Sequence, residues 1–371
     1  MAPSTISVAI QPGQTTLTRI LCLASSSARI CAIATCAAEI GEAPEALRRQ
    51  QEALAAPLGE LVAALGRRPP QIVVTCARGS SGHAATFAKH LIERRFGIPV
   101  AAAAPNIASV YRRSLRLDGQ LFLAVSQSGR SDDLVEQARF ARGSGALTAA
   151  VVNATDSPLA RACDIVLPMA AGPERSVAAT KTFVASLGVL LRLAAAWADD
   201  DALAGALERL PDRLADAAAL DWAAALSTLE DARSLIAIGR GPTLAIAREA
   251  ALKLKETCNL HAEAFSGAEV LHGPVALVAN RYPVLMFMVA DETAAGLAEL
   301  ANGLVSKGAA VYLAGGDEPG AARLPVLAPD HPEADAVCLI QSFYKLALTL
   351  ALRLGIDVDH PRHLQKITRT K

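Results

Sequence analysis

Short apolar runs alternate with amphipathic stretches through most of the chain, and this alternation predicts an α/β protein. Runs of four to eight apolar residues are typical of buried strands, whereas apolar positions spaced three and four apart are typical of helices. Strands are predicted near the start of 71–95 and of 234–258, and at 121–126, 147–153, 164–169, 283–290 and 310–315. Helices are predicted at about 82–96, 132–144, 177–199, 242–258 and 334–354. Strands that alternate with helices indicate a parallel sheet covered on both faces, with ligands at the carboxyl ends of its strands.

The strand–turn–helix unit occurs twice. Residues 71–95 run from a strand through an Arg78-Gly79 turn into a helix, and residues 234–258 repeat this order around Arg240-Gly241. The two arginines stand 162 residues apart, which is about the length of one α/β domain. We therefore predict two domains. The predicted segments are a poorly ordered extension at 1–38, a first domain at 39–200, a helical connector at 201–222, a second domain at 223–355 and a tail at 356–371.

Composition narrows the class of protein. Hydrophobic residues make up 52% of the chain, and 36 basic residues balance 36 acidic ones, so we expect a soluble protein that binds neither nucleic acid nor a membrane. The two long apolar segments are interrupted by charges, at Arg192 in one and at Lys345 and Arg353 in the other. The seven cysteines show no zinc-binding spacing, which predicts buried thiols, no metal site and a reducing, cytoplasmic location.

A predicted strand at 121–126 is followed directly by a turn rich in hydroxyl groups, Ser126-Gln127-Ser128-Gly129. Ser131 then precedes Asp132 and Asp133 at the start of an amphipathic helix. Free backbone N–H groups and the positive end of the helix dipole make such a turn an anion site. The sequence lacks the glycine-rich nucleotide motifs, so a phosphate monoester on a small molecule is favoured over a nucleotide. The alternative is that Ser and Asp act here only as ordinary helix caps.

A second group of polar residues lies in the predicted helix that ends near Cys258. Glu249, Lys253 and Glu256 fall on one stripe of this helix, and a glycine-containing loop then carries His272. A carboxylate and an imidazole brought together in this short stretch could move protons between neighbouring carbons of a substrate. The alternative is an exposed helix face with ion pairs between residues four apart, followed by an ordinary loop histidine.

These segments, in this order, resemble the sugar isomerase (SIS) domain family, in the tandem arrangement found in the isomerase half of glucosamine-6-phosphate synthase. The resemblance runs from about residue 39 to the C-terminus and rests on ARGSSGHA, SQSGRSDD, VAATKTF, KLKE…HAEA…AEVLHGP and the tail DVDHPRHLQK. It implies two doubly wound SIS domains, each a parallel sheet between two layers of helices. It also implies a homodimer with a shared active site and no cofactor.

The resemblance implies two groups of site residues. The phosphate and nearby hydroxyls of a six-carbon sugar phosphate would be held by Ser81, Ser126, Gln127, Ser128 and Ser131, and the sugar would be lined by Val177 and Ala179. Glu256 matches the base that moves a proton between C1 and C2, and Lys253 matches a lysine beside it. His272 matches the residue that opens the sugar ring, reaching in from the other subunit, and Lys366 matches one that contacts the open-chain sugar.

The sequence also departs from the synthase pattern. Ala2 stands where the synthase has its glutaminase cysteine, Arg130 and Ser131 replace an acidic residue and a threonine, and Ala179 replaces a serine. We therefore expect no glutaminase activity and a reaction that runs toward ammonia release, from glucosamine 6-phosphate to fructose 6-phosphate. The alternatives are a galactosamine-6-phosphate deaminase, a deglycase acting on fructosamine-type 6-phosphates, a plain aldose–ketose isomerase, or a sugar-phosphate sensor without catalysis.

Overall fold

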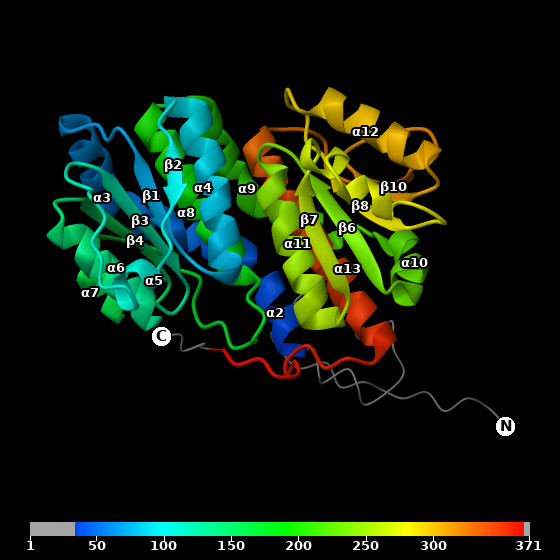
Figure 1. The fold of residues 1–371 in the computed structure, drawn as a ribbon, viewed down its shortest axis with the longest axis horizontal. Helices are drawn as coiled ribbons and strands as arrows, with labels where there is room; N and C mark the ends of the chain where they lie inside the picture. Colours follow the sequence, from blue (N-terminus) through cyan, green and yellow to red (C-terminus); the bar gives the residue numbers. More distant parts are fainter. Residues whose placement is uncertain (1–33, 367–371) are drawn as a thin grey trace.

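The computed structural model describes residues 34–366, and these form two α/β units that lie side by side (Figure 1). Each unit contains a five-stranded sheet in which every strand pair is parallel. The first sheet has the order β2-β1-β3-β4-β5 and the second the order β10-β9-β8-β6-β7. The predicted fold, two doubly wound parallel sheets flanked by helices, is therefore confirmed.

The first unit is built around β1 (Val73–Cys76) and β3 (Leu121–Ser126), which are neighbours at the centre of its sheet. Its remaining strands are β2 (Val100–Ala102), β4 (Leu147–Val152) and β5 (Ile165–Pro168). Its helices are α2 (Ala34–Gly41), α3 (Ala43–Arg67), α4 (Gly79–Phe96), α5 (Asn106–Ser109), α6 (Asp132–Gly143), α7 (Pro158–Ala162) and α8 (Lys181–Ala198). Alternate residues of β3 enter different cores: Leu121, Leu123 and Val125 face the large central core, and Phe122 faces α6 and α7.

The second unit begins after α9 (Asp201–Ala219) and contains β6 (Ser234–Gly239), β7 (His261–Ser266), β8 (Pro283–Phe287), β9 (Ala310–Ala314) and β10 (Ala322–Leu324). Its helices are α10 (Leu226–Asp231), α11 (Thr243–Cys258), α12 (Ala294–Ser306) and α13 (Pro332–Leu354), with short 3-10 turns η2 (Ala223–Ala225), η3 (Glu269–Leu271) and η4 (Pro274–Leu277). One sheet face packs on α12, and the other joins the central core.

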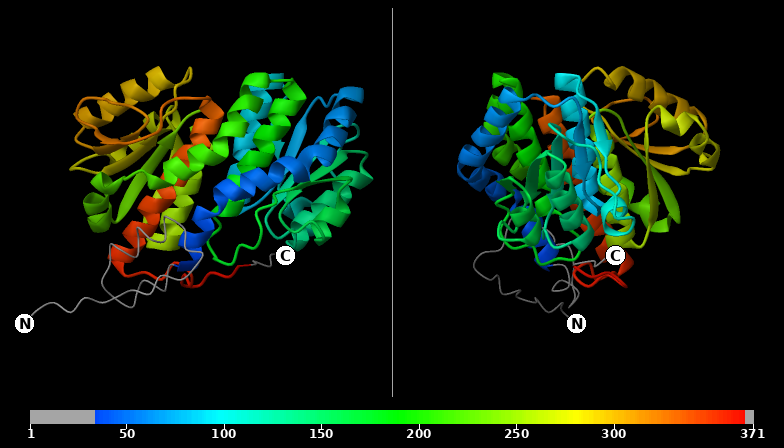
Figure 2. Two further views of the ribbon diagram at one scale, coloured as in Figure 1. Left: turned by 180° about the vertical axis from the view of Figure 1, so that it is seen from behind. Right: turned by 60° about the vertical axis from the view of Figure 1, so that its left-hand side comes forward.

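One continuous core lies between the two sheets. It is filled by α3, α4, α8, α9, α11 and α13, which pack against one another across the boundary between the units (Figure 2). α8 and α13 are long and apolar enough to cross a membrane, but most of each helix is buried in this core. Their apolar character is therefore explained by packing between the sheets.

The N-terminal boundary differs from the prediction. The first helix, α2, begins at Ala34, whereas the extension was expected to run to residue 38; residues 1–33 lie outside the described part of the chain. The Asp359 carboxylate accepts hydrogen bonds from the Thr35 and Cys36 amides at 3.2 and 3.0 Å. A carboxylate at this position satisfies amides that have no partner within the helix and complements its dipole. The C-terminal tail, far away in sequence, thus stabilises the start of α2.

Candidate active site

The hydroxyl-rich turn after β3 has a fixed geometry. The Ser126 hydroxyl accepts a hydrogen bond from the Gly129 amide at 3.1 Å, and Gly129 adopts a left-handed φ of +60°. A Cβ atom at Gly129 would lie 2.1 Å from the Ser157 hydroxyl, so only glycine fits there. Gln127 and Ser128 follow the buried end of the strand and remain half-buried. The turn therefore holds polar groups at the carboxyl end of the sheet, as predicted.

A second hydroxyl comes from the helix that follows the neighbouring strand, β1. β1 and β3 flank the point where the strand order reverses, which is where doubly wound sheets bind ligands. α4 begins here, and its Ser80 hydroxyl donates a 2.9 Å hydrogen bond to Glu249 Oε1. The predicted Ser81 follows Ser80 on α4, is half-buried, and has no side-chain hydrogen bond within residues 34–366. Ser131 precedes α6, and its hydroxyl makes no capping bond to that helix.

The predicted polar stripe on α11 forms a chain of contacts. Lys253 Nζ lies 2.5 Å from Glu256 Oε2 and 3.4 Å from Glu249 Oε1. The Lys253 side chain is 2% exposed and the Glu249 side chain 0%, whereas Glu256 retains 22% exposure. Of the two carboxylates bound to Lys253, Glu256 is therefore the one that a substrate can reach.

Electrostatics keep this stripe charged. Burial opposes ionisation of Glu249, but Lys253, His83 and Ser80 outweigh it and lower the pKa of Glu249. Burial likewise disfavours the Lys253 ammonium, but Glu249 and Glu256 outweigh burial and raise the pKa of Lys253. Lys253 therefore acts as a fixed cation between two carboxylates and does not serve as a proton acceptor near neutral pH.

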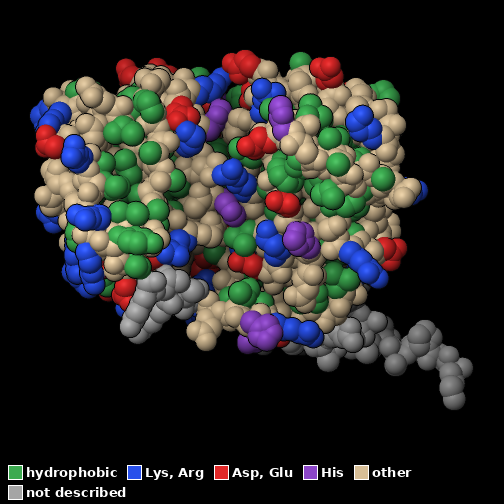
Figure 3. Space-filling model, in the orientation of Figure 1, with side chains coloured by type: hydrophobic (Ala, Val, Ile, Leu, Met, Phe, Trp, Pro, Cys, Tyr) green, Lys and Arg blue, Asp and Glu red, His purple; other side chains and the backbone are tan. Residues whose placement is uncertain are grey.

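Glu249 joins the two units. It lies on α11 of the second unit and accepts hydrogen bonds from two residues on α4 of the first, Ser80 at 2.9 Å and His83 Nδ1 at 2.8 Å. Charged side chains and histidines gather along the same seam on the face shown in Figure 3. The hydroxyl-bearing end of the first sheet and the Lys253–Glu256 pair of the second unit are thus connected through one buried carboxylate.

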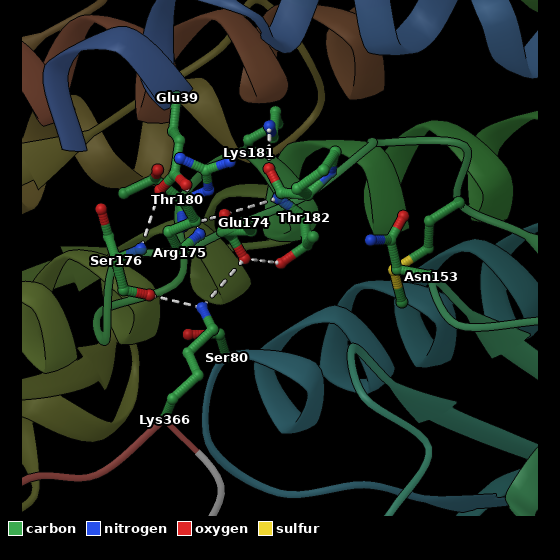
Figure 4. A network of polar contacts seen from close by, with 12 residues as sticks. Glu39, Ser80, Asn153, Glu174, Arg175, Ser176, Thr180, Lys181, Thr182 and Lys366 are labelled. Carbon is green, nitrogen blue, oxygen red and sulfur yellow. Dashed lines mark hydrogen bonds and ion pairs between the residues drawn. The ribbon is translucent and has the colours of Figure 1, made fainter. Parts of the chain in front are cut away.

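The loop between β5 and α8 and the C-terminal tail meet at the same site. Lys366 Nζ lies 3.7 Å from Glu174 Oε2 and also donates a hydrogen bond to the Ser176 carbonyl (Figure 4). Glu174 is fully buried and accepts hydrogen bonds from the Thr180 and Thr182 amides at 3.0 and 3.1 Å. The Glu174 charge also contributes to the raised pKa of Lys253, so the tail lysine and the α11 stripe belong to one electrostatic cluster.

Hydrogen bonds from outside hold this loop in place. Glu39 of α2 accepts from the Arg175 and Ser176 amides (Figure 4). The buried Lys181 ammonium pairs with Glu42 at 2.5 Å. Asn153, at the end of β4, donates to the Gly172 carbonyl at 2.8 Å. A loop that is bonded at several points keeps its backbone groups in a defined position.

Val177 and Ala179, the residues predicted to line the sugar, lie in this loop and are half-buried beside the buried Ser176. Ser176 also donates from its hydroxyl to Asp359 at 3.3 Å, so the loop is bonded to the tail at two points. The predicted lining residues and Lys366 are therefore brought to one region by the same set of contacts.

His272 is not close to Glu256 within one chain. α11 starts at the carboxyl end of β6 and carries Glu256 away from that edge, roughly 20 Å along the helix axis. β7 then runs parallel to β6 and returns the chain, so that Gly267 bonds back to Gly239 and His272 follows at this far edge. The expectation that a short stretch of sequence brings this carboxylate and this imidazole together is wrong for a single chain, because β7 separates them.

The second unit does not repeat the hydroxyl turn. At the carboxyl end of β8, the Asp291 carboxylate accepts hydrogen bonds from the amide and hydroxyl of Thr293 at 2.8 and 2.6 Å. A carboxylate of the chain itself thus occupies a position comparable to the serine turn. A cavity of about 380 Å³ opens beside the ends of β8 and β9, and it is lined by none of the residues described above. The site is therefore a property of the first unit and α11.

Sequence reasoning missed Ser80, His83 and Glu174. Ser80 and His83 are three residues apart in the first turns of α4, so their shared face could have been noticed from spacing alone. Glu174 lies in an irregular loop, and its role depends on the Thr180 and Thr182 amides folding back onto it. No periodic pattern reports such a contact.

A family match and the sequences of known proteins indicate the same family for this chain. Residues 68–196 and 228–324 match the SIS domain family. The chain is 34% identical over 313 residues to the glutamine–fructose-6-phosphate aminotransferase (isomerizing) of Caulobacter vibrioides, an alignment that covers 79% of this chain and 51% of that protein. The chain thus spans about half the length of the curated relatives it matches.

Two solved structures with the same fold also resemble this chain. A protein from Silicibacter pomeroyi DSS-3, provisionally described as a phosphosugar isomerase, is 46% identical with a TM-score of 0.83, and the alignment covers 86% of this chain and 98% of that one. The C-terminal domain of glucosamine-fructose-6-phosphate aminotransferase from Francisella tularensis is 26% identical with a TM-score of 0.77, over 87% of this chain and 97% of that domain.

Proposed function

The chain belongs to the SIS domain family, and on that premise we propose that it is an aminosugar-phosphate deaminase/isomerase. In this proposal it converts glucosamine 6-phosphate and water into fructose 6-phosphate and ammonia. The chemistry is ring opening, transfer of a proton from C2 to C1, and hydrolysis of the resulting C2 ketimine. The names of the relatives support a phosphosugar substrate, and the deaminating direction is our own inference.

One observation carries the proposal. The Glu249 carboxylate binds Ser80, at the ligand-binding edge of the first sheet, and also contacts Lys253, which in turn holds Glu256. A partly exposed carboxylate is thereby linked, through Lys253 and Glu249, to the edge of the first sheet that carries a turn suited to a phosphate ester. Enolisation needs this combination, because the anchor must present the C1–C2 bond to a single positioned base.

The phosphate is assigned to the turn after β3. Backbone N–H groups and hydroxyls at the start of α6 suit an anion, and the helix dipole adds to the attraction. The Ser126 and Ser128 hydroxyls both accept backbone amides within the turn, from Gly129 at 3.1 Å and Arg130 at 3.4 Å, so they shape its backbone. The half-buried Gln127 side chain and the Ser128 hydroxyl, whose contact is long and exposed, are assigned to the ligand. Ser80, in the first turn of α4, supplements the predicted set.

Two lysines are assigned to the negative charge that develops during proton transfer. As Glu256 removes the C2 proton, charge accumulates on the C1 oxygen, and a fixed cation lowers the energy of that state. Lys366 is brought to the site by the Ser176 carbonyl and Glu174, and Lys253 remains charged beside the base. Glu256 then returns the proton to C1, and water attacks C2 to release ammonia.

Ring opening is assigned to His272 of a second copy of the chain. His272 lies at the far edge of its own second sheet, so it cannot serve the site of its own chain. It is exposed, and the flanking Leu271 and Leu277 side chains are each 55% exposed, an unusual arrangement for a surface that always faces water. A homodimer that buries these leucines would deliver His272 to the neighbouring site.

The cysteines of the described residues are assigned a packing role. Glutamine hydrolysis of the synthase type uses a cysteine nucleophile, which must be a thiolate to react. The five cysteines within residues 34–366 are all buried, and burial raises the pKa of each thiol to about 12. None of these five thiols is suited to act as the nucleophile of glutamine hydrolysis.

The test is a panel of sugar phosphates assayed for ammonia release. Glucosamine 6-phosphate, galactosamine 6-phosphate and fructosamine-type 6-phosphates are compared at equal concentrations, with amino-acid release measured in parallel. The proposal predicts the highest kcat/KM with glucosamine 6-phosphate and formation of one fructose 6-phosphate per ammonia. Ammonia or amino-acid release only from another panel member would refute the substrate, and calorimetric binding without turnover would favour a sensor.

A further inference from the structure

The contact between α4 and α11 contains a buried carboxylate with an unusual set of partners. The Glu249 side chain has no exposed surface, and both of its oxygens have a partner in the first unit. Oε1 accepts from Ser80 and lies 3.4 Å from Lys253, and Oε2 lies 2.8 Å from His83 Nδ1. Ser80 and His83 lie on the same face of α4, one helical turn apart, so the first unit supplies two donors to a carboxylate of the second.

These two donors explain the position of Lys253. Its ammonium is closer to Glu256, at 2.5 Å, than to Glu249, at 3.4 Å, although Glu249 is the more deeply buried carboxylate. Attraction between charges is stronger where solvent is excluded, so a bare Glu249 would hold Lys253 more tightly than the partly exposed Glu256. Because Ser80 and His83 already satisfy much of the Glu249 hydrogen-bonding capacity, Lys253 stays directed at Glu256.

We propose that His83 is a positioning residue that keeps Lys253 on Glu256 by satisfying Glu249. This inference rests on the proposed function in one respect, namely that Glu256 is the base. His83 contacts neither Glu256 nor Lys253 and acts only through the Glu249 carboxylate. Without His83, the buried Glu249 oxygen lacks a donor, and Lys253 is the nearest charged group that can replace it. Lys253 then shifts toward Glu249, and the Glu256 carboxylate loses its fixed orientation.

The hydrogen bond defines the substitution that should rescue function. An ionised carboxylate only accepts hydrogen bonds, so His83 Nδ1 must carry the proton. The side-chain amide nitrogen of asparagine can occupy about the same place as Nδ1 and donate in the same direction. His83→Asn should therefore preserve the position of Lys253, whereas His83→Ala should not.

α4 offers a matched control. His90 lies seven residues further along the same face, is 19% exposed against 22% for His83, and also faces a buried carboxylate of the second unit, Glu333 at 4.0 Å. It lies near the other end of the contact between the helices, remote from Lys253. His90→Ala weakens the same interface without touching Glu249.

The experiment compares the kinetics and crystal structures of the three variants with the wild type. His83→Ala should lower kcat about 10- to 100-fold with little change in KM, which is the usual effect of a misplaced catalytic group. His83→Asn should recover most of the rate, and His90→Ala should stay within about twofold of wild type. Melting temperatures of all variants identify any that fail to fold.

Two outcomes overturn the inference. One is a His83→Ala enzyme with wild-type kcat, and the other is an equal loss of kcat in His83→Ala and His90→Ala, which would indicate general loosening of the interface. If the wild type turns over no sugar phosphate, the proposed function fails and the crystal structure of His83→Ala decides this inference alone. Lys253 should then lie out of hydrogen-bonding reach of Glu256, and an unchanged 2.5 Å contact would contradict it.

Discussion

Glu333, at the start of α13, provides a test of the electrostatics that join the two units. Its buried side chain contacts Arg94 at 2.7 Å and Arg95 at 3.5 Å, both on α4, and His331 at 2.9 Å. Burial opposes its ionisation, but His331 and the two arginines outweigh burial and lower the pKa of Glu333 from 4.5 to about 2. Replacing it by Gln removes the charge and keeps the shape.

The lowered pKa of Glu333 sets the size of its contribution to the unfolding free energy. A depression from 4.5 to about 2 corresponds to about 3 kcal/mol of unfolding free energy at neutral pH. Because the folded-state pKa is the lower one, this stabilisation is complete above the unfolded pKa of 4.5 and is lost as the pH falls toward 2. The difference in unfolding free energy between wild type and Glu333→Gln should therefore shrink by about 1 kcal/mol between pH 7 and pH 3.5.

Urea denaturation followed by tryptophan fluorescence at these two pH values measures the difference directly. Asp335→Asn is the matched control, because Asp335 lies two residues along the same helix and burial raises its pKa despite Arg213. Since a raised folded-state pKa has the opposite sign, acidification should favour the wild type over this variant. A difference between wild type and Glu333→Gln that does not change with pH would refute a depressed Glu333 pKa.

Three further predictions concern the site. Gly129→Ala should destabilise the protein by about 2 kcal/mol and weaken sugar-phosphate binding, because the new Cβ atom would lie 2.1 Å from the Ser157 hydroxyl. Thermal melts measure the stability and calorimetry measures the binding. Unchanged values of both would contradict a rigid turn. Lys366→Met should lower kcat about 100-fold or more while sugar-phosphate affinity changes little, and a variant with normal kcat would exclude Lys366 from the reaction. The Glu256→Gln and His272→Ala proteins should each be inactive alone but regain about a quarter of wild-type activity when they are mixed and exchange subunits. Half of the dimers then contain one intact site out of two. No recovery of activity despite subunit exchange would contradict a shared site.

The sequence was sufficient for the architecture because buried parallel strands and amphipathic helices leave strong local patterns. The strand predicted at 121–126 is observed as Leu121–Ser126, and the helix predicted at about 242–258 as Thr243–Cys258. The helix predicted at 177–199 starts later, at Lys181, because the preceding residues are held as a loop by bonds to Glu174. Tertiary contacts therefore decided this boundary.

Two features of the site depended on contacts that no local pattern reveals. β7 lies at the edge of its sheet, and its sequence HAEAFS mixes exposed, half-buried and buried positions, so this strand was not predicted. Its direction places His272 far from Glu256. The Glu249 contacts with Ser80 and His83 join residues more than 160 positions apart. Glu256 and Lys253 were predicted to lie together because four residues or fewer separate them on one helix.

Proton transfer in heavy water tests the central claim most directly. Glucosamine 6-phosphate is incubated in D₂O with wild type or Glu256→Gln, and the C1 and C2 positions of substrate and product are followed by NMR, with binding measured by calorimetry. The account predicts that the wild type forms fructose 6-phosphate carrying hydrogen transferred from C2 or deuterium at C1. Glu256→Gln should bind the sugar phosphate with similar affinity and show neither transfer nor exchange. Transfer at the wild-type rate by Glu256→Gln would contradict the assignment of Glu256 as the base.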